Sequence, residues 1–293
     1  MKSWDIKLFN IIAYTIVGLI TLLCIVPFAF IVSGSFSQNN LIVKYGYALW
    51  PRGYSLDAYK YLMQNPISLL RPFTLSVFVT IVTAAGSLFL ISITAYVLAR
   101  DTFRYKNQFA FFFYFTTLFS GGLIPFYILM VRYLHLRNSI LALILPSLFN
   151  VFFLLMMRSF IKGSVPSSVL DSAMIDGANE FEIYLRIVLP LMKPALASIG
   201  LFEMLGMWNN WSNTMLYISD SKLFTLQYLL YKILTFSNAA FNDMSLVSNT
   251  TISPPTETVK MAMAVLVNTP ILLVYPFLQK FFVKGITIGA VKG

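Results

Sequence analysis

The chain has 293 residues, of which 58% are hydrophobic and only 11% are charged, and its formal net charge is +10 at pH 7. This composition is typical of a protein with several membrane spans, and it excludes an ordinary soluble domain. The basic residues are scattered among loops rather than gathered in one patch, which argues against a nucleic-acid partner. A single cysteine, Cys24, excludes a disulfide framework.

Long apolar runs divide the chain. A transmembrane helix needs about 20 consecutive apolar residues, and six runs come close to that length or exceed it. Five carry no charge, and the run 195–219 contains one acid, Glu203. The first run is longer than the apolar core of a signal peptide, so we expect it to be retained. The sequence therefore predicts an all-α membrane protein of one domain, residues 1–293, with six transmembrane helices at 11–32, 72–99, 107–131, 139–157, 195–219 and 261–279.

Six spans would place both termini on the same side of the membrane. Twelve of the 21 Lys and Arg residues then fall on that side, and nine fall in the longer loops of the other side. Positive charge close to spans favours the cytoplasmic side, so we expect cytoplasmic termini. The basic residues that flank the spans also suit contact with the anionic headgroups of the lipid bilayer.

One hydrophilic segment, 171–194, separates the fourth and fifth predicted spans and reads DSAMIDGANEFEIYLRIVLPLMKP. It predicts two short helices joined at Gly177, which can adopt the left-handed conformation that ends a helix. Ser168 with Asp171 fits a cap for the first helix, and Asn179 with Glu182 fits a cap for the second. Helical spacing predicts an apolar face in each helix, formed by Leu170, Ala173, Met174 and Ala178 and by Phe181, Tyr184, Leu185 and Val188.

This segment has two interpretations. An amphipathic helix on the membrane surface would explain the apolar faces. It explains the acids poorly, because carboxylates are unfavourable beside anionic headgroups. A helix that fits a groove on a protein needs apolar anchors and charges together, so we favour a docking element for a soluble partner. The acids concerned are Asp171, Asp176, Glu180 and Glu182.

The segment resembles the EAA loop of the permeases of ABC importers, whose pattern is Glu-Ala-Ala, then Gly, then Ile-x-Leu-Pro. Asp171 stands where Glu is usual, and Ser172 stands where the first Ala is usual. Both departures are conservative in charge and size. The residues that match in identity and spacing are Ala173, Asp176, Gly177, Ala178, Ile187, Leu189 and Pro190.

The resemblance implies that the loop of about 158–194 is a cytoplasmic coupling helix that sits in a cleft of an ATPase. The chain has no Gly-rich phosphate loop of its own, so we expect no enzyme activity and no cofactor here, with ATP and Mg²⁺ bound by a separate subunit. The implied partners are a second homologous permease, two ABC ATPase subunits and an extracytoplasmic solute-binding protein, at the bacterial inner membrane. The implied coupling residues are Asp171, Ala173, Met174, Asp176, Gly177, Ala178, Phe181, Leu189 and Pro190.

Three more segments resemble carbohydrate permeases of the maltose type. The ending 284–293, KGITIGAVKG, is similar to the tail of the second permease subunit, which implies that Lys292 and Gly293 reach towards the ATPase. Residues 208–227 are similar to the fifth-span region of these permeases. The segment 119–130, FSGGLIPFYILM, resembles the branch that imports complex oligosaccharides, including alginate. An oligosaccharide, with an anionic alginate-like sugar as one option, is therefore the implied substrate.

Polar and aromatic residues in the spans are candidates for a sugar path. Polar groups in a span are costly unless they face a cavity or a partner helix, and asparagines offer donors and acceptors to hydroxyls. The alternatives stay open, because tryptophans favour membrane interfaces, asparagines often bridge helices, and Glu203 can pair with a partner subunit. The candidates are Glu203, Trp208, Asn209, Asn210, Trp211, Asn213, Tyr114 and Tyr127.

The long outer loops, 33–71 and 220–260, carry seven Lys and Arg residues against four acids. Such a field favours an anionic oligosaccharide, and it would equally suit an acidic binding protein.

Other function classes fit less well. A secondary transporter normally needs an intramembrane ion-coupling site and often shows an inverted repeat, whereas only Glu203 is present and no repeat is visible. An intramembrane enzyme lacks an acid-base or metal constellation, since the chain has one histidine, His135, in a short loop. An ABC permease for a non-sugar substrate is the remaining alternative.

Overall fold

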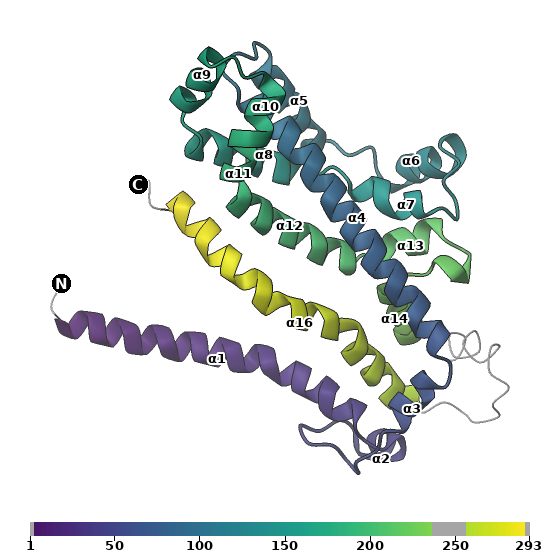
Figure 1. The fold of residues 1–293 in the computed structure, drawn as a ribbon. Coiled ribbons are helices and arrows are strands. Elements are labelled where there is room, and N and C mark those ends of the chain that lie inside the picture. The colour runs from purple at the N-terminus through teal and green to yellow at the C-terminus, as the bar shows by residue number, and fades with distance from the viewer. Residues whose placement is uncertain (1–2, 236–255, 291–293) are drawn as a thin grey trace. The chain divides into compact units, whose positions relative to one another are not determined.

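The computed structural model describes residues 3–235 and 256–290, which form helices and the turns between them (Figure 1). Within these residues the only β-contact is an isolated bridge between Ser37 and Tyr54, so the predicted all-α class is confirmed. The chain divides into two compact units, and the expectation of one membrane domain stays a prediction. Unit 1 consists of Met1–Leu70 and Leu230–Pro270, and unit 2 consists of Arg71–Leu229 and Ile271–Gly293.

The helices differ widely in length. Those of unit 1 are α1 (Ser3–Ser35), α2 (Asn39–Tyr45) and α3 (Asp57–Met63), and those with residues in both units are α4 (Pro66–Ala99), α14 (Leu226–Thr235) and α16 (Thr256–Ala290). Unit 2 holds α5 (Lys106–Leu118), α6 (Leu123–Ile128), α7 (Ile140–Ile144), α8 (Val151–Ser164), α9 (Ser167–Ile175), α10 (Glu180–Ile183), α11 (Leu189–Leu191), α12 (Lys193–Trp208) and α13 (Ser212–Tyr217). It also holds π-helical turns at Leu129–Tyr133 and Tyr184–Val188 and 3₁₀ turns at Leu145–Ser147 and Ser221–Leu223.

Among the described residues, three helices are long and apolar enough to cross a membrane, at Lys7–Ser35, Pro66–Ala99 and Glu257–Val274. Three further pairs of helices qualify only when each bent pair is taken as one span, which makes three to six candidate spans. The predicted runs 107–131 and 139–157 are therefore bent rather than straight helices. The predicted run 195–219 is interrupted at residues 209–211, between α12 and α13. The bent pairs are Lys106–Leu118 with Leu123–Tyr133 (108°), Ile140–Ser147 with Val151–Ser164 (47°) and Glu180–Leu191 with Lys193–Trp208 (77°).

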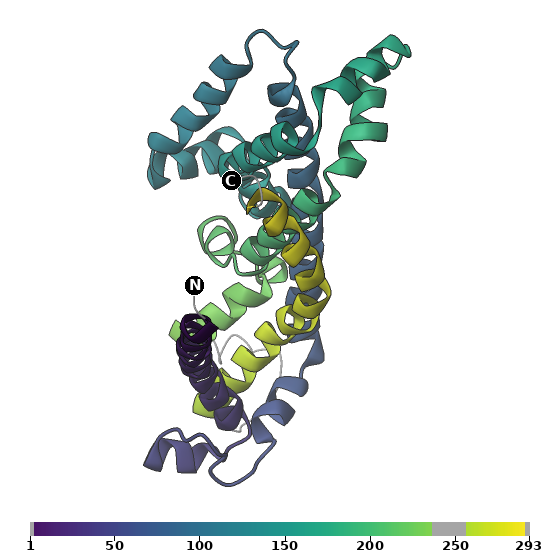
Figure 2. The same cartoon turned by 90° about the vertical axis from the view of Figure 1, so that its left-hand side faces the viewer.

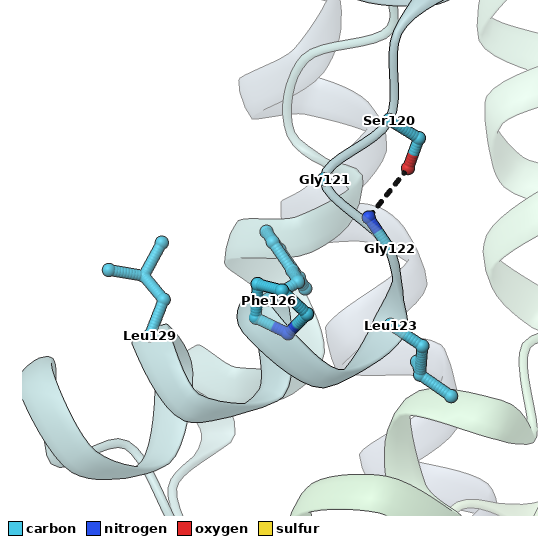
Figure 3. Close-up of a pocket in the computed structure, with 7 residues that line it drawn as sticks. Ser120, Gly121, Gly122, Leu123, Phe126 and Leu129 are labelled. Carbon is cyan, nitrogen blue, oxygen red and sulfur yellow. Dashed lines mark hydrogen bonds between the residues drawn. The ribbon is translucent and has the colours of Figure 1, made fainter.

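Polar side chains accept hydrogen bonds from backbone amides at three breaks between helices, whereas the bend at Met192 has no side-chain cap. The Ser120 hydroxyl accepts a hydrogen bond from the Gly122 amide (3.2 Å), beside a hollow of about 540 Å³ that includes Phe126 and Leu129 (Figure 3). Asn150 accepts bonds from two amides at the start of α8, and Asn210 accepts one at the start of α13. These caps satisfy amide groups that a broken helix leaves without an internal partner. The apolar runs used to predict the spans give no sign of these caps.

The main core of unit 2 joins the end of α4 to α8, α9 and α12. Ile91 and Ala95 of α4 are fully buried there, together with Met157 of α8. Leu170 and Ala173 of α9 pack into the same cluster, at 7% and 9% exposure. We call residues 167–188 the hairpin; it lies at the C-terminal end of α4 in both views (Figure 1, Figure 2). Its inner face is thus part of the core.

The predicted turn at Gly177 and the predicted cap of α10 are found in the structure, but the predicted cap at the start of α9 is not. Gly177 has φ of +82°, which confirms the predicted left-handed turn after α9. Asn179 and Glu182 form the predicted capping box, with the Glu182 amide 2.9 Å from Asn179 Oδ1 and the Asn179 amide 3.2 Å from Glu182 Oε2. The predicted cap by Ser168 is wrong. Pro166, with extended backbone, precedes the helix and no side chain caps it, so Ser168 is already helical.

The predicted apolar face of the second helix is divided in the structure. Tyr184 and Val188 are buried, whereas Phe181 is 60% exposed and Leu185 is 43% exposed. The π-helical turn Tyr184–Val188 changes the rotation per residue, because its backbone bonds span five residues instead of four. Residues that share a face at ordinary helical spacing therefore separate.

Replacing Asn179 by alanine should fray α10, because the N-cap side chain that satisfies the Glu182 amide is lost. The expected cost is about 1 kcal/mol. In detergent or nanodiscs, amide hydrogen exchange of residues 180–184 should become roughly fivefold faster. Ser168→Ala is the matched control and should leave exchange in α9 unchanged, since Ser168 does not cap that helix. Equal effects of both substitutions would contradict these cap assignments.

Candidate functional site

The hairpin presents one apolar surface to the core and another to its surroundings. Leu170 and Ala173 are buried, while Ile175 beside the Gly177 turn is 86% exposed and Phe181 is 60% exposed. Phe181 was predicted from the sequence as a coupling residue, whereas Ile175 was not. The available signal was that Ile175 is an apolar residue one position away from the predicted buried face. The tip of the hairpin thus offers two large apolar side chains.

The remaining predicted coupling residues belong to the same hairpin and its continuation. Asp171 and Asp176 are exposed, and Asp176 ends α9. The Ala178 amide bonds the Ala173 carbonyl at 3.0 Å, which closes the turn around Gly177. Leu189 and Pro190 form α11, directly before the 77° bend into α12.

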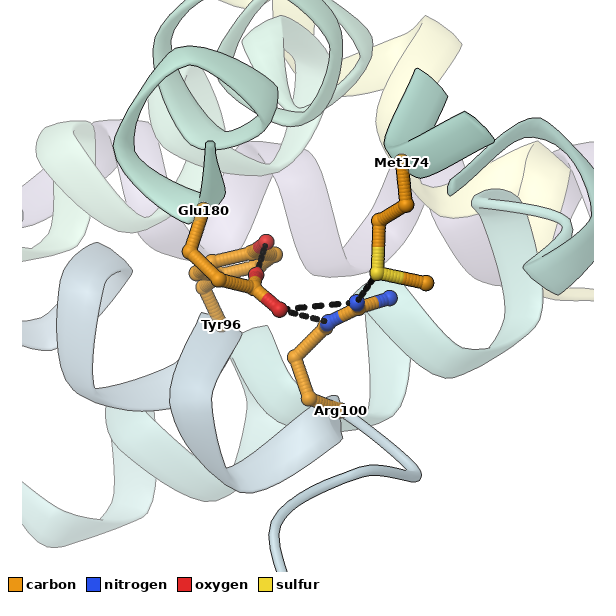
Figure 4. A network of polar contacts seen from close by, with 4 residues as sticks. All are labelled: Tyr96, Arg100, Met174 and Glu180. Carbon is orange, nitrogen blue, oxygen red and sulfur yellow. Dashed lines mark hydrogen bonds and ion pairs between the residues drawn. The ribbon is translucent and has the colours of Figure 1, made fainter. Parts of the chain in front are cut away.

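A buried arginine connects the hairpin to the end of α4. Arg100 is 7% exposed, and its Nη2 lies 2.8 Å from Glu180 Oε1 and 3.2 Å from Met174 Sδ (Figure 4). The Tyr96 hydroxyl donates to the other oxygen of Glu180. Met174 was predicted as a site residue, but Arg100 and Tyr96 were not. A charge directly after the apolar run 72–99 was the only hint in the sequence.

The contacts of Glu180 explain its charge state. Glu180 lies in the loop 158–194, outside the predicted spans. Burial raises the pKa of its carboxyl, but hydrogen bonds from Tyr96 and Arg100 and the positive charge of Arg100 outweigh burial, so the pKa lies below its ordinary value. The group therefore remains a carboxylate at neutral pH and keeps the ion pair with Arg100.

Glu203 lines a hollow of about 570 Å³ in unit 2. Its side chain is 7% exposed and accepts a hydrogen bond from the Ser87 hydroxyl at 3.0 Å. The hollow is also lined by Thr116, Asn150 and Phe202. Sequence reasoning identified Glu203 but missed these neighbours. Phe202 is adjacent to it in α12, whereas Thr116 and Asn150 come from other segments that only the folded chain brings together.

The other predicted path residues lie outside this hollow and take part in local packing. Trp208 is 8% exposed, with its ring edge on Phe73 at 6.2 Å between centroids. Tyr127 stacks on Tyr217 at 5.9 Å. Tyr114 is 47% exposed, and Trp211 is partly exposed at the N-cap of α13. The three asparagines bond backbone, with Asn209 donating to Leu205, Asn213 donating to Leu143, and Asn210 accepting from the Asn213 amide.

Two remaining predictions concern the chain end and bound ions. Lys292 and Gly293 lie outside the described residues. In residues 3–235 and 256–290, no group of three or more His, Cys, Asp and Glu side chains is placed to hold a metal ion.

Comparison with known proteins gives full-length matches. No protein-family model matches the chain. The polygalacturonan/rhamnogalacturonan transport system permease protein YtcP of Bacillus subtilis (strain 168) is 40% identical over 98% of this chain and 99% of its own. Protein LplC of the same organism is 37% identical, over 98% and 96%. Among solved structures, a chain of a bacterial ABC transporter involved in the import of the acidic polysaccharide alginate has a TM-score of 0.83, at 28% identity and coverage of 96% and 99%.

These matches cover 96–98% of this chain, so they concern the whole protein rather than one motif. They exclude the secondary-transporter alternative. The chain belongs to the family of membrane permeases of ABC-type sugar transport systems.

Proposed function

We propose that the chain forms half of the translocation path of an ATP-driven importer of acidic oligosaccharides. In this proposal six spans cross a bacterial inner membrane with both termini in the cytoplasm. A second homologous permease completes the path, two ABC ATPase subunits bind ATP and Mg²⁺, and an extracytoplasmic protein delivers the sugar. The chain itself catalyses no reaction.

The hairpin is the proposed dock for an ATPase subunit, and the exposure of Ile175 and Phe181 carries this proposal. Large apolar side chains at 86% and 60% exposure are costly in water unless a partner covers them. Their helices are short and anchored in the core of unit 2 through Leu170 and Ala173. An apolar tip on a rigid base suits insertion into a groove of another protein, and the exposed acids Asp171 and Asp176 can pair with charges at its rim.

The proposed substrate class rests on two of the relatives whose names give a substrate. One transports polygalacturonan and rhamnogalacturonan, and the other takes part in the import of the acidic polysaccharide alginate. Polygalacturonan and alginate are both polymers of uronic acids, so their fragments carry a carboxylate on each ring. The seven basic residues of the outer loops against four acids would attract such an anion.

The hollow at Glu203 is the proposed part of the sugar path within this chain. It combines a carboxylate, an amide and hydroxyls with the ring of Phe202, which are groups that bind sugar hydroxyls and sugar faces. Glu203 would repel the carboxylates of the sugar. We therefore expect it to accept from hydroxyl groups, while the outer basic residues respond to the charge.

The substrate proposal predicts a preference in reconstituted importer. The permease pair, ATPase subunits and binding protein, purified together, are placed in proteoliposomes with neutral or uronic oligosaccharides of equal length. Uronic oligosaccharides should stimulate ATP hydrolysis at least about tenfold more efficiently, and rising salt should reduce the difference by screening. Equal stimulation by neutral sugars would refute the acidic substrate class, and no stimulation by any sugar would refute the sugar importer.

Replacing Gly177 by valine should separate ATP hydrolysis from sugar uptake. Gly177 has φ of +82° and open space around its Cβ position, so the substitution acts through backbone strain of about 1–3 kcal/mol rather than through a clash. A distorted turn would misplace Ile175 and Phe181. We expect the number of sugar molecules imported per ATP hydrolysed to fall several-fold.

Gly163→Val in α8 is the matched control, since Gly163 also has open space for a side chain but has no positive φ. It should leave the ratio of sugar imported to ATP hydrolysed unchanged. Unchanged coupling in Gly177→Val would remove the hairpin from the proposed mechanism.

A further inference from the structure

Three polar residues of α4 and its end face the hairpin at a spacing of four. Ser92, Tyr96 and Arg100 fall on one side of a helix at this spacing. The Ser92 and Tyr184 hydroxyls lie 2.7 Å apart, Tyr96 donates to Glu180, and Arg100 contacts Glu180 through both Nε and Nη2, at 3.3 and 2.8 Å. The rings of Tyr96 and Tyr184 pack at 5.5 Å between centroids. Glu180 and Tyr184 are themselves four residues apart, so the two rows match.

Arg100 also connects the two arms of the hairpin to each other. Its Nη2 contacts Met174 on α9 and Glu180 on α10, which lie on opposite sides of the Gly177 turn (Figure 4). Arg100 itself directly follows Ala99, the last residue of α4. The guanidinium at the end of α4 therefore contacts both arms of the hairpin.

The polar contacts constrain motion in a way that the apolar core does not. Apolar contacts are non-directional and permit small sliding of one helix along another. The Arg100 side chain is 7% exposed, whereas that of Glu180 is 53% exposed. A guanidinium that loses its carboxylate is therefore left as a buried charge without that partner, which is unfavourable. Separation of the hairpin from α4, or a shift of one along the other, would expose Arg100 to that penalty. The hairpin and the end of α4 are thus held in one register.

We propose that Ser92, Tyr96 and Arg100 are positioning residues of the coupling step, which make α4 move with the hairpin as one rigid body. The proposal rests on the proposed docking of the hairpin to an ATPase. A displacement of the hairpin then tilts α4, a helix of 34 residues that is long enough to cross the membrane. None of the three residues contacts sugar or nucleotide in this mechanism.

The test is a double-mutant cycle on the complete importer in proteoliposomes, read as sugar molecules imported per ATP hydrolysed. Glu180→Gln removes the charge and keeps the shape, and Arg100→Met replaces the cation with an apolar chain of similar length. Each should lower the ratio roughly tenfold. The double variant should be no worse than either single one, because both remove the same interaction.

Asp101→Asn is the control. Asp101 pairs with Lys106 at the same end of α4, but its side chain is 80% exposed, and this surface ion pair should not affect coupling. Because the ratio is measured per ATP hydrolysed, a smaller amount of assembled importer does not change it. If Arg100→Met fails to assemble, Tyr96→Phe with Glu180→Gln carries the test.

A second measurement reports the rigid body directly. The chain has one cysteine, so spin labels can be placed at Val97→Cys, an exposed position of α4, and at Ser172→Cys in α9, in a Cys24→Ser background. In the parent, the distance between labels should be the same with and without a non-hydrolysable ATP analogue, and in Glu180→Gln it should change or broaden.

The outcomes separate the two proposals. Normal coupling in Glu180→Gln and Arg100→Met, with uncoupling in Gly177→Val, would refute the positioning role and leave the docking role standing. Normal coupling in all three would refute both. A label distance that changes with nucleotide in the parent would also refute the rigid body.

Discussion

Backbone amide and carbonyl groups that enter a bilayer need partners inside the protein, because hydrocarbon supplies none. Helices meet this requirement, and at three breaks between helices side chains supply partners for the backbone. Ser120, Asn150 and Asn210 each accept bonds from amides at a break. Such breaks let a span bend without leaving those amides unpaired. They also explain why asparagines predicted as sugar contacts are used here to bond backbone.

The acidic residues of the hairpin have two different roles. Glu182 bonds the Asn179 amide and so stabilises the start of α10, and Glu180 pairs with the buried Arg100. These two acids have contacts inside the chain, although Glu180 is itself 53% exposed, and Asp171 and Asp176 are exposed. A charged segment between spans therefore need not direct all its charges to a partner. Some of them determine how the docking element is held on its own protein.

Family membership and geometry answer different questions about this permease. Full-length identity of 40% to a transport-system permease assigns the class of the protein, but it does not identify the groups that transmit force. Those groups follow from burial and distance, since a cation at 7% exposure between two arms of a hairpin is expensive to separate from its carboxylate. The same comparison gives no role to the Glu203 hollow, whose neighbours come from separate segments.

Several features follow from the sequence alone because their physics is local. Apolar runs predicted helices and spans, Gly177 predicted a left-handed turn, and the pair Asn179 and Glu182 predicted a capping box; the structure confirms the helices, the turn and the box. Ser168 failed as a cap because Pro166 starts the helix earlier. The bends within spans, the lining of the hollow and the partners of Arg100 required the tertiary structure. The partners of Arg100 and the hydrogen bond between Ser87 and Glu203 join residues 74 to 116 positions apart in the chain, and no local spacing rule determines which distant segments a fold brings into contact.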